Sequence, residues 1–167
     1  MVTIARARLA AGTMATTLLL SSVAWAQVQR PDIKVAATPT AGPVKAGGTI
    51  TVRLAVRLPP HVHVQSDKPR DPSLIPTALT LVPPPGFSLD RIAYPKAIEL
   101  SQSGRAEPLA VFGGEFIIEA RLAALAGIPS GEHLVQATLR YQACNESVCF
   151  APARAAARWT ITVSGAN

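Results

Sequence analysis

Several segments of the chain alternate between apolar and polar residues with a period of two, which is the pattern of a half-buried β-strand. In the clearest segment, residues 50–58 place five aliphatic side chains on one face, and Pro59-Pro60 ends the run. Residues 61–64 alternate again and predict a second, short strand. A further short strand is predicted near residues 33–36.

Five more segments have strand patterns, at residues 77–82, 91–94, 112–122, 133–143 and 157–163. Turn residues punctuate them, most clearly at Pro83-Pro84-Pro85-Gly86. Residues 120–126 have a helical composition, but Gly127 and Pro129 bound them closely and favour a strand end. About seven or eight short strands without a long helix predict an all-β fold, namely an immunoglobulin-like antiparallel β-sandwich.

The first residues have the pattern of an export signal. Arg6 and Arg8 are followed by an apolar stretch that reaches Val23, and Ala24-Trp25-Ala26 provides the small-x-small site of a signal peptidase. The alternative is an uncleaved membrane anchor, for which the apolar stretch is short. We expect residues 1–26 to be removed and the mature protein to be exported, soluble and periplasmic.

The remaining chain divides into a lead-in and one domain. Residues 27–47 are rich in Pro, Ala, Gly and Thr and predict a loose lead-in, followed by the domain at residues 48–167. The net charge of the whole chain is +6, and without Arg6 and Arg8 there remain 14 basic and 10 acidic residues, or +4. These charges are scattered singly, so the sequence does not favour a nucleic-acid surface.

Two cysteines, Cys144 and Cys149, are the only ones in the chain. In an oxidising compartment we expect them to form a disulfide at least part of the time. A ring of about six residues contributes only roughly 2 kcal/mol, against about 4.7 kcal/mol for a 100-residue loop. A disulfide between cysteines this close in sequence stabilises the fold only weakly, which makes thiol–disulfide exchange the more informative hypothesis. By spacing alone, an inert hairpin disulfide remains an equal alternative.

The setting of the cysteines is more specific than their spacing. Tyr141-Gln142-Ala143-Cys144, a short polar loop and then Cys149-Phe150-Ala151-Pro152 lead into an alternating final strand. This segment resembles the N-terminal periplasmic domain of the thiol:disulfide interchange protein DsbD. The resemblance extends over roughly residues 45–163 and includes the four segments His63 with Ser66-Asp67-Lys68-Pro69, Leu74-Ile75-Pro76, Pro85-Gly86 and Tyr94-Pro95.

The resemblance implies an immunoglobulin-like domain that relays electrons and needs no bound cofactor. Cys144 and Cys149 match the redox pair of the family. Cys144 would form the mixed disulfide with downstream partners, and Cys149 would be the resolving sulfur and the contact for the donor. The implied donor is a membrane-embedded thiol reductase, and the implied acceptors are periplasmic thioredoxin-like or disulfide isomerase proteins. Cytochrome c biogenesis is a downstream role that the resemblance permits.

The chain departs from the family pattern in several respects. Well-known members shield the disulfide with an Asp-Glu-Phe-Tyr-Gly cap, whereas the corresponding region of this sequence begins Tyr94-Pro95-Lys96-Ala97. Tyr94, Tyr141 and Phe150 are therefore the candidate cap or site-lining residues, with a core position as the alternative for Tyr141. The sequence given also ends at Asn167 without a membrane domain or a thioredoxin-like domain; if the chain is complete, we expect the electron donor to be another protein.

Two other functions are weaker alternatives. One is a non-catalytic β-sandwich binding or assembly module whose hairpin disulfide is structural. The other is metal handling by His61 and His63, predicted on one exposed strand face, with His133 or a thiolate as a further ligand. Histidines in such a position are more often simply solvated, so we predict no metal site. The serines lie in no GxSxG motif, and no paired carboxylates indicate hydrolysis.

Overall fold

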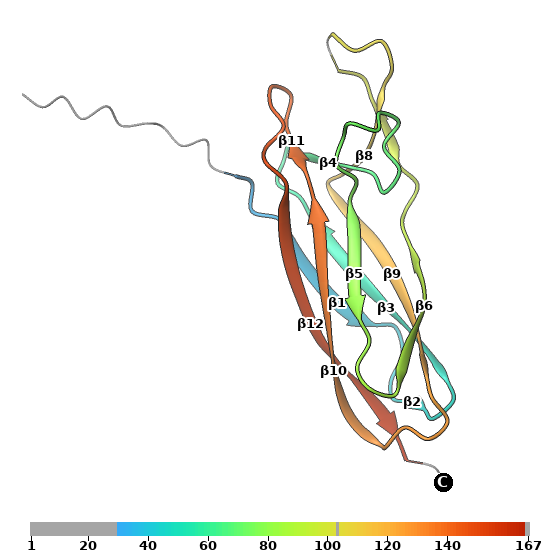
Figure 1. Cartoon of the computed structure of the whole chain (residues 1–167). Helices are drawn as coiled ribbons and strands as arrows, with labels where there is room; N and C mark the ends of the chain where they lie inside the picture. The colour runs from blue at the N-terminus through green and yellow to red at the C-terminus, as the bar shows by residue number, and fades with distance from the viewer. Residues whose placement is uncertain (1–29, 103, 166–167) are drawn as a thin grey trace, which may run out of the picture.

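Two four-stranded sheets face each other in the computed structural model, which describes residues 30–102 and 104–165 (Figure 1). The first sheet has the order β1 (Lys34–Pro39), β3 (Thr49–Arg57), β9 (Glu115–Ala124) and β6 (Phe87–Ala93). The second has the order β2 (Val44–Lys45), β12 (Ala153–Ser164), β10 (Gly131–Tyr141) and β5 (Ala78–Val82). All pairs are antiparallel except β2 with β12. The predicted immunoglobulin-like β-sandwich is confirmed.

The core lies between the two sheets and is built from the alternating apolar positions. Along β3, residues 50, 52, 54 and 56 are buried, whereas the ends of the strand are exposed. Strands β9, β10 and β12 show the same alternation, and Trp159 of β12 is a core residue. Because side chains of a strand point alternately to its two faces, this period of two assigns each strand one buried face. The alternation of apolar and polar residues in the sequence therefore predicts the sandwich.

A third, smaller sheet closes one end of the sandwich. Its order is β11 (Ala143–Cys144), β4 (His63–Gln65), β8 (Leu109–Gly113) and β7 (Ile98–Leu100), and all its pairs are antiparallel. In Figure 1 this end is the upper one, opposite the C-terminus, and it carries the connection between β10 and β12. The two cysteines lie in that connection, so the third sheet forms one side of the candidate site.

The described residues contain twelve strands, more than the seven or eight expected, because several strands are only two or three residues long. The segment at residues 112–122, predicted as one strand, is instead divided between β8 and β9. Gly114 separates them with a φ of 62°, a left-handed conformation that glycine adopts without strain. The break lets β8 join the third sheet while β9 continues in the first.

The strand predicted at residues 61–64 begins later than expected. The backbone N–H of Val62 donates to the carbonyl of Pro59 at 3.2 Å, which closes a turn, and His61 has a φ of 60°. A left-handed residue cannot continue an extended strand. His61 is therefore an exposed turn residue, whereas His63 in β4 is buried, and the prediction that both lie on one exposed strand face is wrong.

The segment expected to be a loose lead-in contributes to the sandwich. β1 pairs with β3 along its whole length, and Val44 of β2 is buried in the core. The predicted signal peptide at residues 1–26 lies outside the described residues. Within the part of the chain that the structure describes, no helix is long and apolar enough to cross a membrane.

Candidate functional site

Cys144 and Cys149 are joined by a disulfide across the tip of the connection between β10 and β12. Asn145 folds the intervening residues, because its side-chain oxygen accepts hydrogen bonds from the backbone N–H groups of Ser147 and Val148 at 2.9 and 2.8 Å. The backbone N–H of Asn145 in turn donates to the carbonyl of Val148. Asparagine favours such side-chain turns. We call residues 144–149 the cysteine loop.

The two cysteines differ sharply in exposure. Cys144 belongs to β11 and has an exposed fraction of 0%, whereas Cys149 is exposed at the rim of the loop. The difference arises because Ala143 and Cys144 pair with Val64 and His63 of β4, while Cys149 lies outside the named strands. Exchange requires a partner thiolate to reach a sulfur. Cys149 is the accessible member of the pair.

Gln65 provides a polar contact to the buried sulfur. It lies on β4, is fully buried, and its Nε2 lies 3.8 Å from Sγ of Cys144. Its backbone carbonyl accepts a hydrogen bond from the hydroxyl of Thr77, which holds β4 against the start of β5. An amide donor favours the charged form of a thiol, so Gln65 can stabilise a Cys144 thiolate. Sequence reasoning missed Gln65; the available signal was its position two residues after His63 on one strand.

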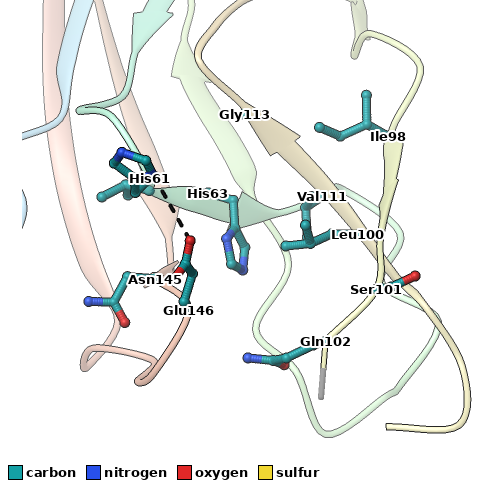
Figure 2. A pocket seen from close by; sticks show the side chains of 11 residues that line it. His61, His63, Ile98, Leu100, Ser101, Gln102, Val111, Gly113, Asn145 and Glu146 are labelled. Atoms are coloured by element: carbon teal, nitrogen blue, oxygen red, sulfur yellow. Dashed lines mark ion pairs between the residues drawn. The ribbon is translucent and has the colours of Figure 1, made fainter.

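A pocket of about 490 Å³ lies beside the cysteine loop (Figure 2). One side is formed by β4 and its preceding turn together with Asn145 and Glu146, and the other by Ile98, Leu100 and Val111 with their neighbours. Figure 2 shows the imidazole of His63 extending into this space. His61 is paired with Glu146 at the outer rim, 3.9 Å apart, and both side chains are highly exposed.

His63 is 8% exposed, and its Nε2 has no hydrogen-bond partner among the described residues. Burial lowers the pKa of its imidazole from the usual value, because the charged form loses hydration. Burial thus favours the neutral imidazole, which can accept a proton. A buried polar atom without a partner is uncommon and requires an explanation.

The three predicted lining residues, Phe150, Tyr141 and Tyr94, lie in different parts of the structure. Phe150 directly follows the pair, and its backbone N–H donates to the carbonyl of Ala143 at 2.8 Å. Tyr141 is a buried residue of β10, and burial raises the pKa of its phenol.

Tyr94 contacts residues outside the cysteine loop. Its hydroxyl accepts a hydrogen bond from the backbone N–H of Leu79, and its ring stacks on Phe112 of β8. Burial raises the pKa of the Tyr94 phenol, and the bond from Leu79 opposes that rise. Neither partner belongs to the cysteine loop, so its role as a cap stays a prediction.

The three histidines do not come together. His133 lies near the start of β10, at the end of the sandwich away from the cysteines, where its ring contacts Phe87 and its Nε2 lies 3.0 Å from the carbonyl of Pro129. Within residues 30–102 and 104–165, no group of three or more His, Cys, Asp and Glu side chains could hold a metal ion. The metal-handling alternative therefore has no ligand set in the described part of the chain.

Comparison with solved structures finds proteins with a similar fold. Among solved structures, the N-terminal periplasmic domain of ScsB from Proteus mirabilis is similar with a TM-score of 0.50 and 14% sequence identity, over 73% of this chain and 43% of that one. The chain thus spans less than half of the ScsB structure. At this identity the similarity shows the fold alone.

Two subunits of bacterial surface fibres are less similar. BcpA, the major pilin subunit of Bacillus cereus, has a TM-score of 0.37 and 15% identity, over 81% of this chain and 40% of that one. AggA, the major subunit of aggregative adherence fimbriae type I from Escherichia coli, has a TM-score of 0.35 and 11% identity, over 80% of this chain and 96% of that one.

No curated protein matches the sequence. The family model described as "Thiol:disulfide interchange protein DsbD, N-terminal" matches residues 32–159, which is most of the chain and includes both cysteines, Gln65 and His63. The chain therefore belongs to the family of the N-terminal domain of the thiol:disulfide interchange protein DsbD.

Proposed function

We propose that this protein is a periplasmic electron relay whose Cys144–Cys149 pair exchanges disulfides with partner proteins. The observation that carries the proposal is the asymmetric disulfide: Cys149 is exposed, whereas Cys144 is buried beside the amide of Gln65. An exchange site needs one sulfur that a partner thiolate can reach and one leaving sulfur whose thiolate is stabilised. A purely structural bridge needs neither, and a ring this small gains little stability.

The exposure of the two residues supports a different division of roles from the one that the family resemblance implied. Cys144 was expected to form the mixed disulfide with downstream partners, but its exposed fraction is 0%. Cys149 is the residue that a partner sulfur can reach. We therefore assign the mixed disulfide to Cys149 in both directions of transfer, and the resolving role to Cys144.

Reduction of the domain then follows in two balanced steps. A thiolate of the electron donor attacks Sγ of Cys149, a new S–S bond forms, and Cys144 leaves as a thiolate beside Nε2 of Gln65. A second thiol of the donor then attacks the mixed disulfide and releases the Cys149 sulfur. Two electrons have passed to the pair, and the donor retains a disulfide.

Delivery of the electrons uses the same residues in the opposite order. The Cys149 thiolate attacks the disulfide of the acceptor and forms a mixed disulfide, while one acceptor sulfur leaves. Cys144 then attacks Sγ of Cys149, the internal disulfide re-forms, and the acceptor departs with two thiols. The donor we propose is a membrane-embedded thiol reductase, and the acceptors are thioredoxin-like or disulfide isomerase proteins.

Trapping of mixed disulfides tests this assignment. A Cys144→Ser variant keeps the exposed Cys149 without its resolving partner, so mixed with a thioredoxin-like protein that carries a single cysteine, activated as a mixed disulfide with nitrobenzoate, it should accumulate a covalent complex. The matched Cys149→Ser variant keeps only the buried thiol and should accumulate at least about tenfold less. Non-reducing gel electrophoresis of both reactions provides the comparison. Equal or greater trapping through Cys144 would contradict the assignment of the mixed disulfide to Cys149.

The reduction potential distinguishes the relay from the structural alternative. Equilibration of the protein with glutathione or dithiothreitol buffers should give a potential above about −300 mV, because structural disulfides of secreted proteins generally lie below that value. A lower potential would show that the disulfide is a stable structural bridge, and the protein would then be a non-catalytic binding or assembly module.

A further inference from the structure

The feature that the relay does not yet explain is the buried imidazole of His63. In the register of the third sheet, His63 of β4 lies directly opposite Cys144 of β11. Directly opposed residues of an antiparallel pair point to the same face, with Cβ atoms about 5 Å apart. Gln65, two residues along β4, is on that face too, and its contact with Sγ of Cys144 shows where the sulfur lies.

The free nitrogen of His63 lies in an apolar and protected place. Its Nε2 is buried and finds no hydrogen-bond partner among the described residues. The opposite wall of the pocket consists of Ile98, Leu100 and Val111, with the uncharged side chains of Ser101 and Gln102 beside them. Among the described residues, the other charged or titratable groups that line the pocket are His61 and Glu146, which pair with each other at the exposed rim.

We propose that His63 accepts the proton of the Cys144 thiol when Cys144 resolves the mixed disulfide. The inference rests on the relay function proposed above. In the disulfide state Sγ of Cys144 carries no proton, so Nε2 has nothing to accept from it. In the reduced and mixed-disulfide states the sulfur of Cys144 is released from the internal bond and can carry a proton, which the imidazole can take directly or through one water molecule.

The step is balanced. The Cys144 thiol transfers its proton to Nε2 of His63 and its sulfur attacks Sγ of Cys149. The internal S–S bond forms, the bond between Cys149 and the acceptor breaks, and the acceptor sulfur leaves with the electron pair. The imidazolium then passes its proton to the departing sulfur or to water. Burial supports this role because it lowers the pKa of His63 and so favours the neutral imidazole before the step.

An aromatic nitrobenzoate disulfide, which releases a coloured thiolate, separates the two halves of the reaction. The reduced protein should release one thiolate when Cys149 attacks and a second when Cys144 resolves. His63→Gln should slow the second release at pH 7 by at least about tenfold and leave the first unchanged. The dependence of the second rate on pH near the imidazole pKa should disappear. His61→Asn, which changes the exposed histidine of the same pocket, should alter neither rate.

The results separate the two proposals. Absence of both releases from the unmodified reduced protein would overturn the relay itself. Normal releases with the same pH profile in His63→Gln would overturn only the role of His63. If that variant does not fold, an NMR titration of the unmodified protein replaces it. The imidazole pKa of His63 should then differ between the oxidised and reduced states, and equal values would contradict the proposal.

Discussion

At the scale of single residues, the central fact is that one strand pair buries one sulfur and leaves the other accessible. Cys144 is held by β4, and Cys149 lies at the rim of the loop. A leaving thiolate in an apolar setting is unfavourable unless a donor stabilises it. Gln65 supplies that donor, so we expect it to influence how readily the disulfide opens.

Replacement of Gln65 by leucine should slow reduction of the disulfide. The variant keeps a buried side chain of similar size and removes the Nε2 donor to Sγ of Cys144. A hydrogen bond of about 1 kcal/mol corresponds to a rate about fivefold lower. The measurement is the rate of reduction by a dithiol at pH 7. Gln142→Leu is the control, because that amide donates to the carbonyl of Phe150 instead of to sulfur. If Gln65→Leu and Gln142→Leu slow reduction equally, Gln65 acts only through the conformation of the cysteine loop.

At the scale of elements, two short segments determine the geometry of the site. The Asn145 turn holds the cysteine loop, and the break at Gly114 directs β8 into the third sheet. In each case a single residue determines the geometry. Asn145 supplies a hydrogen-bond acceptor, and Gly114 supplies a left-handed backbone conformation.

Asn145→Ala should make the disulfide more oxidising. The change removes the acceptor for the N–H groups of Ser147 and Val148, so closing the ring costs more free energy. A loss of about 1.4 kcal/mol raises the reduction potential by about 30 mV, and equilibration with a thiol buffer measures it. Ser147→Ala keeps the backbone N–H group and should leave the potential unchanged. A potential that is unchanged or lower in Asn145→Ala would refute the role of the turn.

Gly114→Ala should destabilise the fold by about 1 kcal/mol. An added Cβ meets no atom within 4 Å, so the cost comes from the left-handed φ of 62° alone. Urea unfolding measures the free energy. Gly127 also has open space for a Cβ and no positive φ, so Gly127→Ala is the control and should be close to neutral. If both variants unfold at the same urea concentration, the break between β8 and β9 does not depend on glycine.

At the scale of the whole molecule, ion pairs connect the loops around the small sheet. Arg70 pairs with Glu99, and Asp71 pairs with Arg105 at 3.1 Å, so the chain after β4 is tied to the chain around and after β7. The Asp71 carboxylate also accepts hydrogen bonds from the hydroxyl and the backbone N–H of Ser73. These bonds, followed by Arg105, lower the pKa of Asp71 to about 2.

The low pKa of Asp71 predicts how stability changes in acid. A carboxyl whose pKa is lower in the folded state contributes stability above its unfolded pKa of 3.8 and loses it as the pH falls toward about 2. Asp71→Asn should therefore have a lower urea midpoint at pH 6, with a difference that shrinks below about pH 4. Asp90→Asn, which removes the partner of Arg121 on the first sheet, is the matched control. A difference that stays constant with pH would contradict this contribution of Asp71.

The sequence by itself determined the strands, the sandwich and the cysteine pair, because alternation reports which face of a strand is buried and the Tyr141–Pro152 segment is specific. It did not reveal that residues 112–122 divide at Gly114, since a left-handed glycine leaves no mark on apolar periodicity. Only the tertiary structure decided which sulfur is exposed and that Gln65 and His63 lie beside Cys144. Cys144 lies about 80 positions from Gln65 and His63 in the sequence. Pairing between distant strands brings them together, and no local pattern encodes that pairing.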